Sequence, residues 1–207
     1  MDKICAVISG GEYAEMNDIR DCQSIIVCDR GYEYAVRDGI APTLIIGDFD
    51  SLSCELPTGI DIVRLPIEKD DTDTMSAVRH ALDLGFKHIR IYCALGGRLD
   101  HLYANIQTAA FAAARGASVK LCGKDTEIYV FSDRALTLPA CEGWSLSVFS
   151  VTDVSRGVSI RGAKYSLEDA TVTNTFPIGT SNEWYGANDV EIEVKEGILA
   201  VMLCRMP

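Results

Sequence analysis

The sequence predicts an α/β fold, with a mainly parallel sheet flanked by helices in the N-terminal part and an antiparallel β-sandwich in the C-terminal part. Two observations support this prediction. Up to about residue 125, short β-branched apolar runs alternate with segments of helical periodicity, as in a parallel sheet covered on both faces. Beyond that point the helical periodicity vanishes, and short runs of alternating apolar and polar residues are separated by turn residues.

Six segments of the N-terminal part are predicted strands, because they are short, β-branched and mostly without polar alternation. They are Lys3–Ile8, Ser24–Cys28, Thr43–Gly47, Asp61–Leu65, His88–Cys93 and Ser118–Leu121. Strands of this kind, connected by helices, form open Rossmann-like sheets in which ligands bind outside the carboxyl ends of the strands.

Two helices are predicted between these strands. The segment Thr72–Leu84 ends before Gly85, and its apolar face comprises Met75, Val78, Ala81 and Leu82. The segment Asp100–Arg115 ends before Gly116, and its apolar face comprises Leu102, Ile106, Ala109, Ala110 and Ala113.

The C-terminal part is expected to contain only strands. The predicted strands are Glu127–Phe131, Ala135–Leu138, Trp144–Ser150, Val158–Arg161, Ala170–Thr175, Asp189–Val194 and Ile198–Cys204. Their alternation indicates antiparallel pairing in a small sandwich. We therefore predict two domains, residues 1–128 and residues 129–207.

Composition and charge narrow the class of protein. Nineteen basic and 30 acidic residues give a net charge of -11, which argues against nucleic acid or an anionic membrane as a partner. The first apolar run, Ile4–Ile8, is shorter than a signal peptide or a membrane-spanning helix requires. We expect a cytoplasmic protein that has neither a nucleic-acid nor a membrane partner.

The eight cysteines are expected to be reduced. They form no Cys-x-x-Cys pair, and most lie inside apolar runs. Small buried thiols explain this pattern better than a disulfide framework or a zinc site does.

Three acidic clusters follow predicted strands: Gly47–Ser51, Lys69–Asp73 and Gly96–His101. The carboxyl ends of parallel strands share one edge, so we expect the carboxylates to meet there. Such carboxylates repel one another unless a cation joins them, and aspartate oxygens suit Mg²⁺. The carboxylates are those of Asp48, Asp50, Asp70, Asp71, Asp73 and Asp100.

Groups that bind phosphate accompany these carboxylates. Gly96 and Gly97 offer backbone N–H groups near a helix N-terminus, while Arg98 and Lys69 offer positive charge. Each feature alone also fits a helix cap or a turn, but their coincidence after three strands favours phosphoryl transfer. The P-loop signature and the dinucleotide-binding glycine pattern are both missing.

The ordered set of motifs resembles the thiamine pyrophosphokinase family over nearly the whole chain. Asp29-Arg30-Gly31 joins the three acidic clusters in the family's order and rough spacing. In the C-terminal part, Gly162–Tyr165 and Gly179–Trp184 resemble the family's thiamine-binding β-domain.

The resemblance implies an enzyme that uses Mg²⁺ and transfers the diphosphate of ATP to the hydroxyethyl group of thiamine, releasing AMP. It implies that residues 1–128 bind ATP and residues 129–207 bind thiamine. It also implies a homodimer, with sites between the α/β domain of one chain and the β-domain of the other.

The resemblance further implies roles for individual residues, carried over by position. The metal and phosphate carboxylates would be Asp48, Asp50, Asp71 and Asp73, and the reaction would also use Arg98 and Asp100. The nucleotide would be bound by Asp29, Lys69, Thr72, Gly96, Gly97, Arg98 and His101. Thiamine would be bound by Thr180, Ser181, Asn182 and Trp184, with the indole ring stacked on the cationic substrate.

Two alternative functions remain open from the residues themselves. Asp48-Phe49-Asp50 also fits the metal-binding Asp-x-Asp of a nucleotide-sugar transferase, although this leaves the other two clusters unexplained. The second alternative is a non-catalytic sensor that binds thiamine or a nucleotide without turnover.

Overall fold

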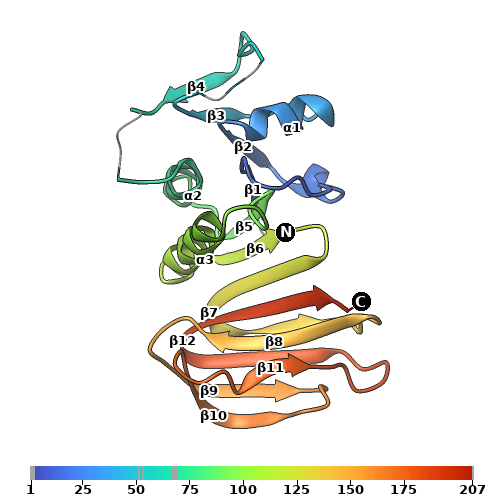
Figure 1. The fold of residues 1–207 in the computed structure, drawn as a ribbon. Helices are drawn as coiled ribbons and strands as arrows, with labels where there is room; N and C mark the ends of the chain where they lie inside the picture. Colours follow the sequence, from blue (N-terminus) through green and yellow to red (C-terminus); the bar gives the residue numbers. More distant parts are fainter. Residues whose placement is uncertain (1–2, 51, 53, 67–69, 207) are drawn as a thin grey trace. The chain divides into compact units, whose positions relative to one another are not determined.

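The computed structural model describes residues 3–206, except residues 51, 53 and 67–69. The chain has a mixed α/β fold and divides into two compact units (Figure 1). The first comprises Met1–Ala112 with Val119–Lys124, and the second comprises Ala113–Ser118 with Asp125–Pro207.

The sheet of the first unit contains the six predicted strands, each within one residue of its expected bounds. They are β1 (Ile4–Ile8), β2 (Ser24–Cys28), β3 (Leu44–Gly47), β4 (Asp61–Arg64), β5 (His88–Tyr92) and β6 (Ser118–Cys122). Their order in the sheet is β6-β5-β1-β2-β3-β4, and the pairs β5–β1, β1–β2, β2–β3 and β3–β4 are parallel. Adjacent parallel strands therefore end at one edge of the sheet.

Both predicted helices of the first unit are present, as α2 (Asp73–Asp83) and α3 (Leu99–Ala113). Sequence analysis missed α1 (Gly31–Arg37) and the 3-10 helix η1 (Ile19–Asp21), which are too short to show a periodic apolar face.

The buried face of α3 differs from the prediction, because two polar residues lie within it. Asn105 and Thr108 are buried, whereas Leu102 and Ile106 are only half-buried. Asn105 Nδ2 donates to the carbonyl of Ala94 at 2.8 Å, and Thr108 Oγ1 donates to the carbonyl of Ala104 at 2.9 Å. These bonds satisfy the polar groups and make their burial possible.

The second unit is built from antiparallel strands. They are β7 (Thr126–Leu138), β8 (Trp144–Ser150), β9 (Val154–Arg161), β10 (Leu167–Thr173), β11 (Gly179–Asn182) and β12 (Val190–Arg205). Strand β12 pairs with β7 along its length, with β9 through its first half and with β8 through its second half. Its apolar residues pack into one core with those of β8 and β9.

Two pairs of predicted strands are each one continuous strand. The runs Glu127–Phe131 and Ala135–Leu138 both belong to β7, and the runs Asp189–Val194 and Ile198–Cys204 belong to β12. The interruption in β12 is a register irregularity between Val194 and Ile198, so pairing with β7 resumes after it. A bulge and a turn give the same break in a hydrophobic pattern.

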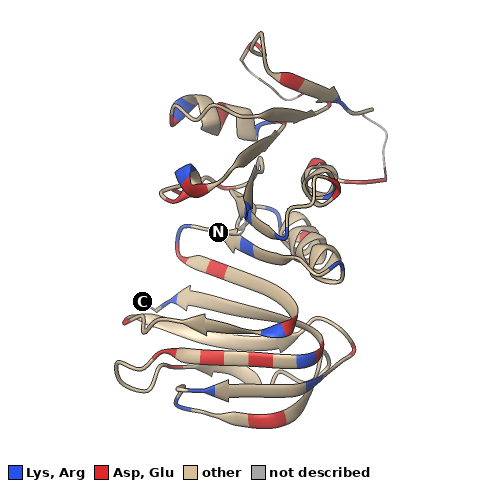
Figure 2. Ribbon diagram, turned by 180° about the vertical axis from the view of Figure 1, so that it is seen from behind, with Lys and Arg blue, Asp and Glu red and all other residues tan. Residues whose placement is uncertain are grey.

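In the first half of β12, charged residues alternate with core residues and therefore lie on the opposite face of the strand. Glu191 and Glu193 pair with Arg161 of β9, at 2.7 and 3.1 Å. Figure 2 shows acidic residues along this strand. The pairs match the backbone register, in which Glu191 lies opposite Arg161.

All eight cysteines are free thiols, as predicted. Cys5, Cys28, Cys93 and Cys122 are buried, and burial raises the pKa of Cys5 to about 12. Cys204 is exposed, contrary to the expectation from its apolar run, because it lies near the end of β12. Within the described part of the chain, no helix has the length and apolar character needed to cross a membrane.

Candidate active site

A pocket of about 870 Å³ lies at the carboxyl edge of the parallel sheet in the first unit. Segments that follow β1, β2, β3 and β5 line it, together with the first turns of α2 and α3. Its lining comprises Ser9, Gly10, Gly11, Glu12, Tyr13, Cys28, Asp29, Arg30, Tyr34, Asp48, Thr72, Asp73, Thr74, Ala94, Gly96, Gly97, Arg98, His101 and Asn105. The pocket therefore brings together residues from all three acidic clusters.

Three non-glycine residues beside this edge have left-handed backbone conformations. They are Asp29 (φ 40°) after β2, Phe49 (φ 64°) after β3 and Cys93 (φ 56°) after β5. Such conformations are unfavourable for L-residues and are concentrated at functional sites. The strain agrees with the location of the pocket.

Asp29, Asp48 and Asp50 form a carboxylate cluster, in which one oxygen of each lies within 4.8 Å of the others. The backbone N–H of Asp50 donates to Asp48 Oδ1 at 3.2 Å. The charge of Asp48 is the main cause of a raised pKa of the Asp50 carboxyl. Three hard oxygen donors with mutual repulsion fit a small divalent cation such as Mg²⁺.

The aspartates of the second acidic cluster lie in different surroundings. Asp73 lines the pocket, whereas Asp71 forms an ion pair with Arg79 of α2 at 2.5 Å. The guanidinium of Arg79 also lies 5.4 Å from the ring centroid of Phe111. Among the described residues, neither aspartate belongs to the carboxylate cluster, and Lys69 lies outside the residues that the structure describes.

The first turn of α2 is fixed by hydroxyl groups. Thr72 caps the helix, with Oγ1 accepting from the backbone N–H of Met75 at 3.1 Å. Thr74 is buried, and its Oγ1 lies 2.8 Å from Oγ of Ser9. The second bond joins the end of β1 to the start of α2 within the pocket.

Gly96 and Gly97 both have left-handed backbones, with φ of 82° and 69°. They lie between β5 and α3 and line the pocket, so the loop can present backbone N–H groups to an anion. A side chain at Gly96 would overlap the carboxylate of Glu12. The turn therefore favours glycine for its left-handed conformation, and a side chain at Gly96 would also displace the Glu12 carboxylate.

Arg98 and Asp100 form a two-bond ion pair. Arg98 Nε and Nη2 donate to the two oxygens of Asp100, at 3.1 and 2.6 Å. These bonds hold the pKa of Asp100 below its usual range. Arg98 and His101 line the pocket, whereas Asp100 is exposed outside its lining.

Sequence analysis did not single out the pocket residues Ser9–Tyr13. The signal was present, because Gly10-Gly11 comes directly after the first predicted strand.

In the second unit, the predicted thiamine residues Thr180 and Ser181 are exposed on β11. Asn182 is buried, and its side-chain amide is bonded to the backbone. Its Oδ1 accepts from the N–H groups of Tyr165 and Glu183, at 3.0 and 2.9 Å, while Nδ2 donates to the carbonyl of Tyr165 at 2.7 Å. This amide holds two segments of the second unit together.

Trp184 is half-buried and packs against the core of the second unit. It forms an isolated bridge with Ala163. Its Nε1 atom is buried with no hydrogen-bond partner among the described residues. The ring therefore has both a core-facing contact and an unused donor.

Replacing Asn182 with alanine is expected to destabilise the second unit by about 1–3 kcal/mol, because the Tyr165 backbone loses both bonds to it. The measurement is the free energy of unfolding in urea. Asn188→Ala is the control, because that exposed residue makes one side-chain bond, to the carbonyl of Tyr185 at 3.1 Å. Equal stability of the two variants would contradict the structural role of Asn182.

Comparison with known proteins relates both parts of the chain to the same family. The sequence matches the family model of the thiamin pyrophosphokinase catalytic domain over residues 17–121. It matches the model of the thiamin pyrophosphokinase vitamin B1 binding domain over residues 135–199. Thiamine pyrophosphokinase from Bacillus subtilis is 27% identical over 161 residues, which cover 75% of this chain and 75% of that protein.

Solved structures are similar over nearly the whole chain. The crystal structure of thiamine pyrophosphokinase from Bacillus subtilis has a TM-score of 0.86 at 23% identity, covering 98% of this chain and 99% of that one. The enzyme from Geobacillus thermodenitrificans has a TM-score of 0.79 at 25% identity, covering 97% of each chain. Because the matched models together span most of the sequence, the chain belongs to the thiamin pyrophosphokinase family.

Proposed function

We propose that this protein transfers the diphosphate of ATP to the hydroxyethyl group of thiamine, forming thiamine diphosphate and AMP. The observation that carries the proposal is the pocket of the first unit. It joins the Asp29 and Asp48 carboxylates to the glycine turn at Gly96 in a single cavity. Carboxylates for a metal and N–H groups for phosphate are the parts that phosphoryl transfer requires.

The two parts of the chain divide this task. Residues 1–128 form a Rossmann-like domain that binds ATP, and residues 129–207 form a β-sandwich domain that binds thiamine. The active enzyme is a cytoplasmic homodimer. The parallel strand pairs of the first unit, the antiparallel pairs of the second and the family resemblance support this division.

Mg²⁺ is the proposed metal, held by Asp29, Asp48 and Asp50. When bound, it neutralises charge on the phosphate oxygens of ATP. This ligand set differs from the one implied by resemblance, because Asp29 takes the place of Asp71 and Asp73 in the carboxylate cluster. Asp71 instead forms an ion pair with Arg79, about two turns into α2.

The remaining pocket residues bind and orient the reacting groups. The backbone N–H groups of Gly96 and Gly97 and the guanidinium of Arg98 receive the transferring diphosphate. Asp73 orients the thiamine hydroxyl and accepts its proton, because it is the pocket-lining member of its cluster and Asp100 has a lowered pKa. The hydroxyl oxygen bonds to the β-phosphorus, and the bond from that phosphorus to the oxygen of AMP breaks.

Thiamine is bound by exposed groups of the second unit. Thr180 and Ser181 face solvent, and Trp184 offers the exposed part of its half-buried aromatic ring. Asn182 holds this segment in position and does not contact thiamine, because its side-chain amide is already bonded to the backbone of Tyr165.

The test is to incubate the purified protein with ATP, Mg²⁺ and thiamine and to quantify the products by chromatography. AMP and thiamine diphosphate should form in equal amounts, with no ADP. Tight thiamine binding without AMP would favour the sensor instead. Glycosyl transfer from a nucleotide sugar, in a parallel incubation that contains one, would favour the transferase.

Arg98→Ala is expected to lower the turnover number by about a hundredfold, because the variant removes one preorganised charge beside the transferring diphosphate. Steady-state rates of AMP release measure the effect. Arg20→Ala is the matched control, since Arg20 is exposed on η1 outside the pocket lining. A near-normal rate in the Arg98 variant would remove that residue from the proposed mechanism.

A further inference from the structure

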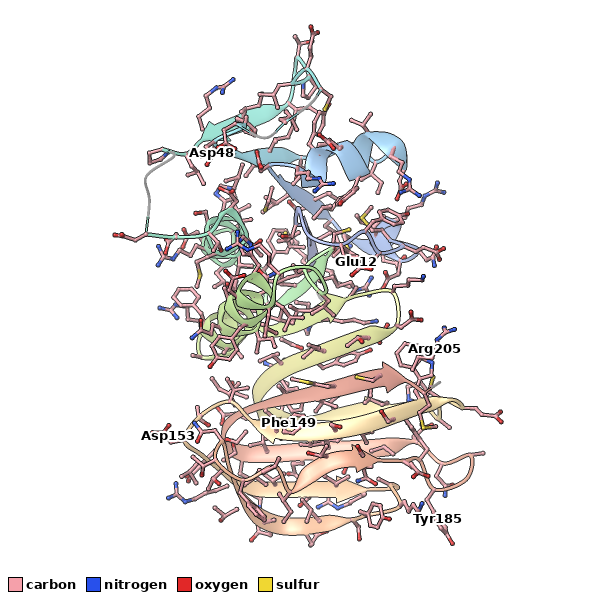
Figure 3. The ribbon with its side chains drawn as sticks, in the orientation of Figure 1. Glu12, Asp48, Phe149, Asp153, Tyr185 and Arg205 are labelled. Carbon is pink, nitrogen blue, oxygen red and sulfur yellow. The ribbon has the colours of Figure 1, made fainter. Side chains whose placement is uncertain are left out.

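We propose that Glu12 recognises the ribose hydroxyls of the nucleotide and so makes the enzyme prefer ribonucleotides to deoxyribonucleotides. The inference rests on the proposed function, since it takes a nucleoside triphosphate as the ligand of the pocket. Glu12 lies on the segment that follows β1, and Asp48 lies on the segment that follows β3 (Figure 3).

The carboxylate of Glu12 lies beside the glycine turn that is proposed to bind phosphate. A Cβ atom built on Gly96 would overlap Oε2 of Glu12 and would lie 3.0 Å from its Cβ and Cδ atoms. Glu12 and Gly96 both line the pocket. Glu12 therefore lies next to the part of the cavity that is proposed to bind phosphate.

The next residue along the chain belongs to an aromatic wall of the same pocket. The rings of Tyr13 and Tyr34 meet edge to face, with centroids 5.5 Å apart, and both residues line the cavity. Tyr34 Oη donates to the carbonyl of Gly11 at 2.7 Å, and Tyr13 Oη donates to Asp38 Oδ2 at 2.9 Å. These bonds fix the wall, and the Arg37 guanidinium lies over one face of the Tyr13 ring, 4.0 Å from its centroid. The remaining aromatic surface of the wall suits the flat face of a base.

Ribose joins the base of a nucleotide to its phosphates. A nucleotide with its base at Tyr13 and its phosphates at Gly96 therefore places its ribose next to Glu12. A carboxylate at this position repels phosphate but accepts hydrogen bonds from O–H donors. Glu12 is exposed, and among the residues that the structure describes none donates a hydrogen bond to its carboxylate, so its acceptor capacity is available to the sugar.

The test compares ATP with 2′-deoxy-ATP as diphosphate donors for the wild type, Glu12→Gln and Glu12→Ala. The wild type should prefer ATP by about tenfold or more in kcat/KM, the scale of one hydrogen bond to a charged group. Glu12→Ala should lose most of that preference through a raised KM for ATP, with a smaller loss in Glu12→Gln. Glu15→Gln is the matched control, an exposed residue of the same segment that accepts from Asn17 at 3.2 Å.

Two results would overturn the proposal. The first is a wild-type preference that survives in Glu12→Ala. The second is an equal change for both nucleotides, which indicates a carboxylate that only repels phosphate.

The same variants test the proposal if the wild type releases no AMP and the proposed function fails. Calorimetric binding of ADP and 2′-deoxy-ADP then replaces turnover as the readout. A preference for ADP that depends on Glu12 supports ribose recognition, and its absence overturns it.

Discussion

The turnover number of the Asp48→Asn variant is expected to fall by about a thousandfold, at the upper end of the effect of removing one preorganised group. Asp48 follows directly after β3. Like Asp29, it belongs to the carboxylate cluster and also lines the pocket. Asparagine keeps the size of the side chain but removes a charge and one strong metal ligand. The measurement is single-turnover formation of AMP across a range of Mg²⁺ concentrations.

The Mg²⁺ dependence separates a ligand from a structural residue. If Asp48 helps to hold the cation, raising Mg²⁺ should restore part of the rate in Asp48→Asn. Asp83→Asn serves as the control, because Asp83 is exposed at the end of α2 and does not line the pocket. A full rate at ordinary Mg²⁺ in Asp48→Asn would exclude the carboxylate cluster as the metal site.

Gly31→Ala should reduce the free energy of unfolding by about 3 kcal/mol, the scale of severe overpacking. The first residue of α1 packs against the end of β1, where an added methyl group would overlap the carbonyl oxygen of Ile8 and lie 2.8 Å from that of Ser9. Backbone atoms cannot move aside as a flexible side chain can. The loss is a large share of the roughly 5–15 kcal/mol that stabilises a typical domain.

Urea unfolding monitored by circular dichroism measures this loss, and Gly10→Ala provides the comparison. A methyl group on Gly10 would lie 3.2 Å from Cβ of Arg30, a much smaller overlap, and 3.7 Å from the nearest backbone atom, the nitrogen of Gly31. We expect this second variant to lose less than about 1 kcal/mol. Equal losses in both variants would refute the explanation from backbone overlap.

Hydrophobic patterning was sufficient to predict the central strands β1, β2 and β3 of the parallel sheet, because both of their faces are buried, whereas β4 is mostly exposed. Ile45 and Val27 are fully buried in β3 and β2, so each run is apolar without alternation. The same reasoning failed for β12, where a local register irregularity interrupts the pattern as a turn would. Periodicity alone also missed α1, whose seven residues are too few for an amphipathic stripe.

The pocket was predictable in location but not in detail. Aspartates after three strands pointed to one edge of the sheet. Of these, Asp48 and Asp73 line the cavity there, whereas Asp50, Asp70, Asp71 and Asp100 do not. The partner of Asp71 was not predictable, because Arg79 reaches it from two turns along α2. The place of Glu12 depends on a contact with Gly96 across more than 80 positions of sequence, which no local pattern encodes.

The pairing of β12 also bears on how the chain reaches its native state. Three partners, β7, β8 and β9, are synthesised first, and each lacks its pairing with β12 until Val190–Arg205 leaves the ribosome. Growing polypeptides with unpaired sheet edges are prone to aggregate. Nascent chains halted before this segment should therefore depend on chaperones.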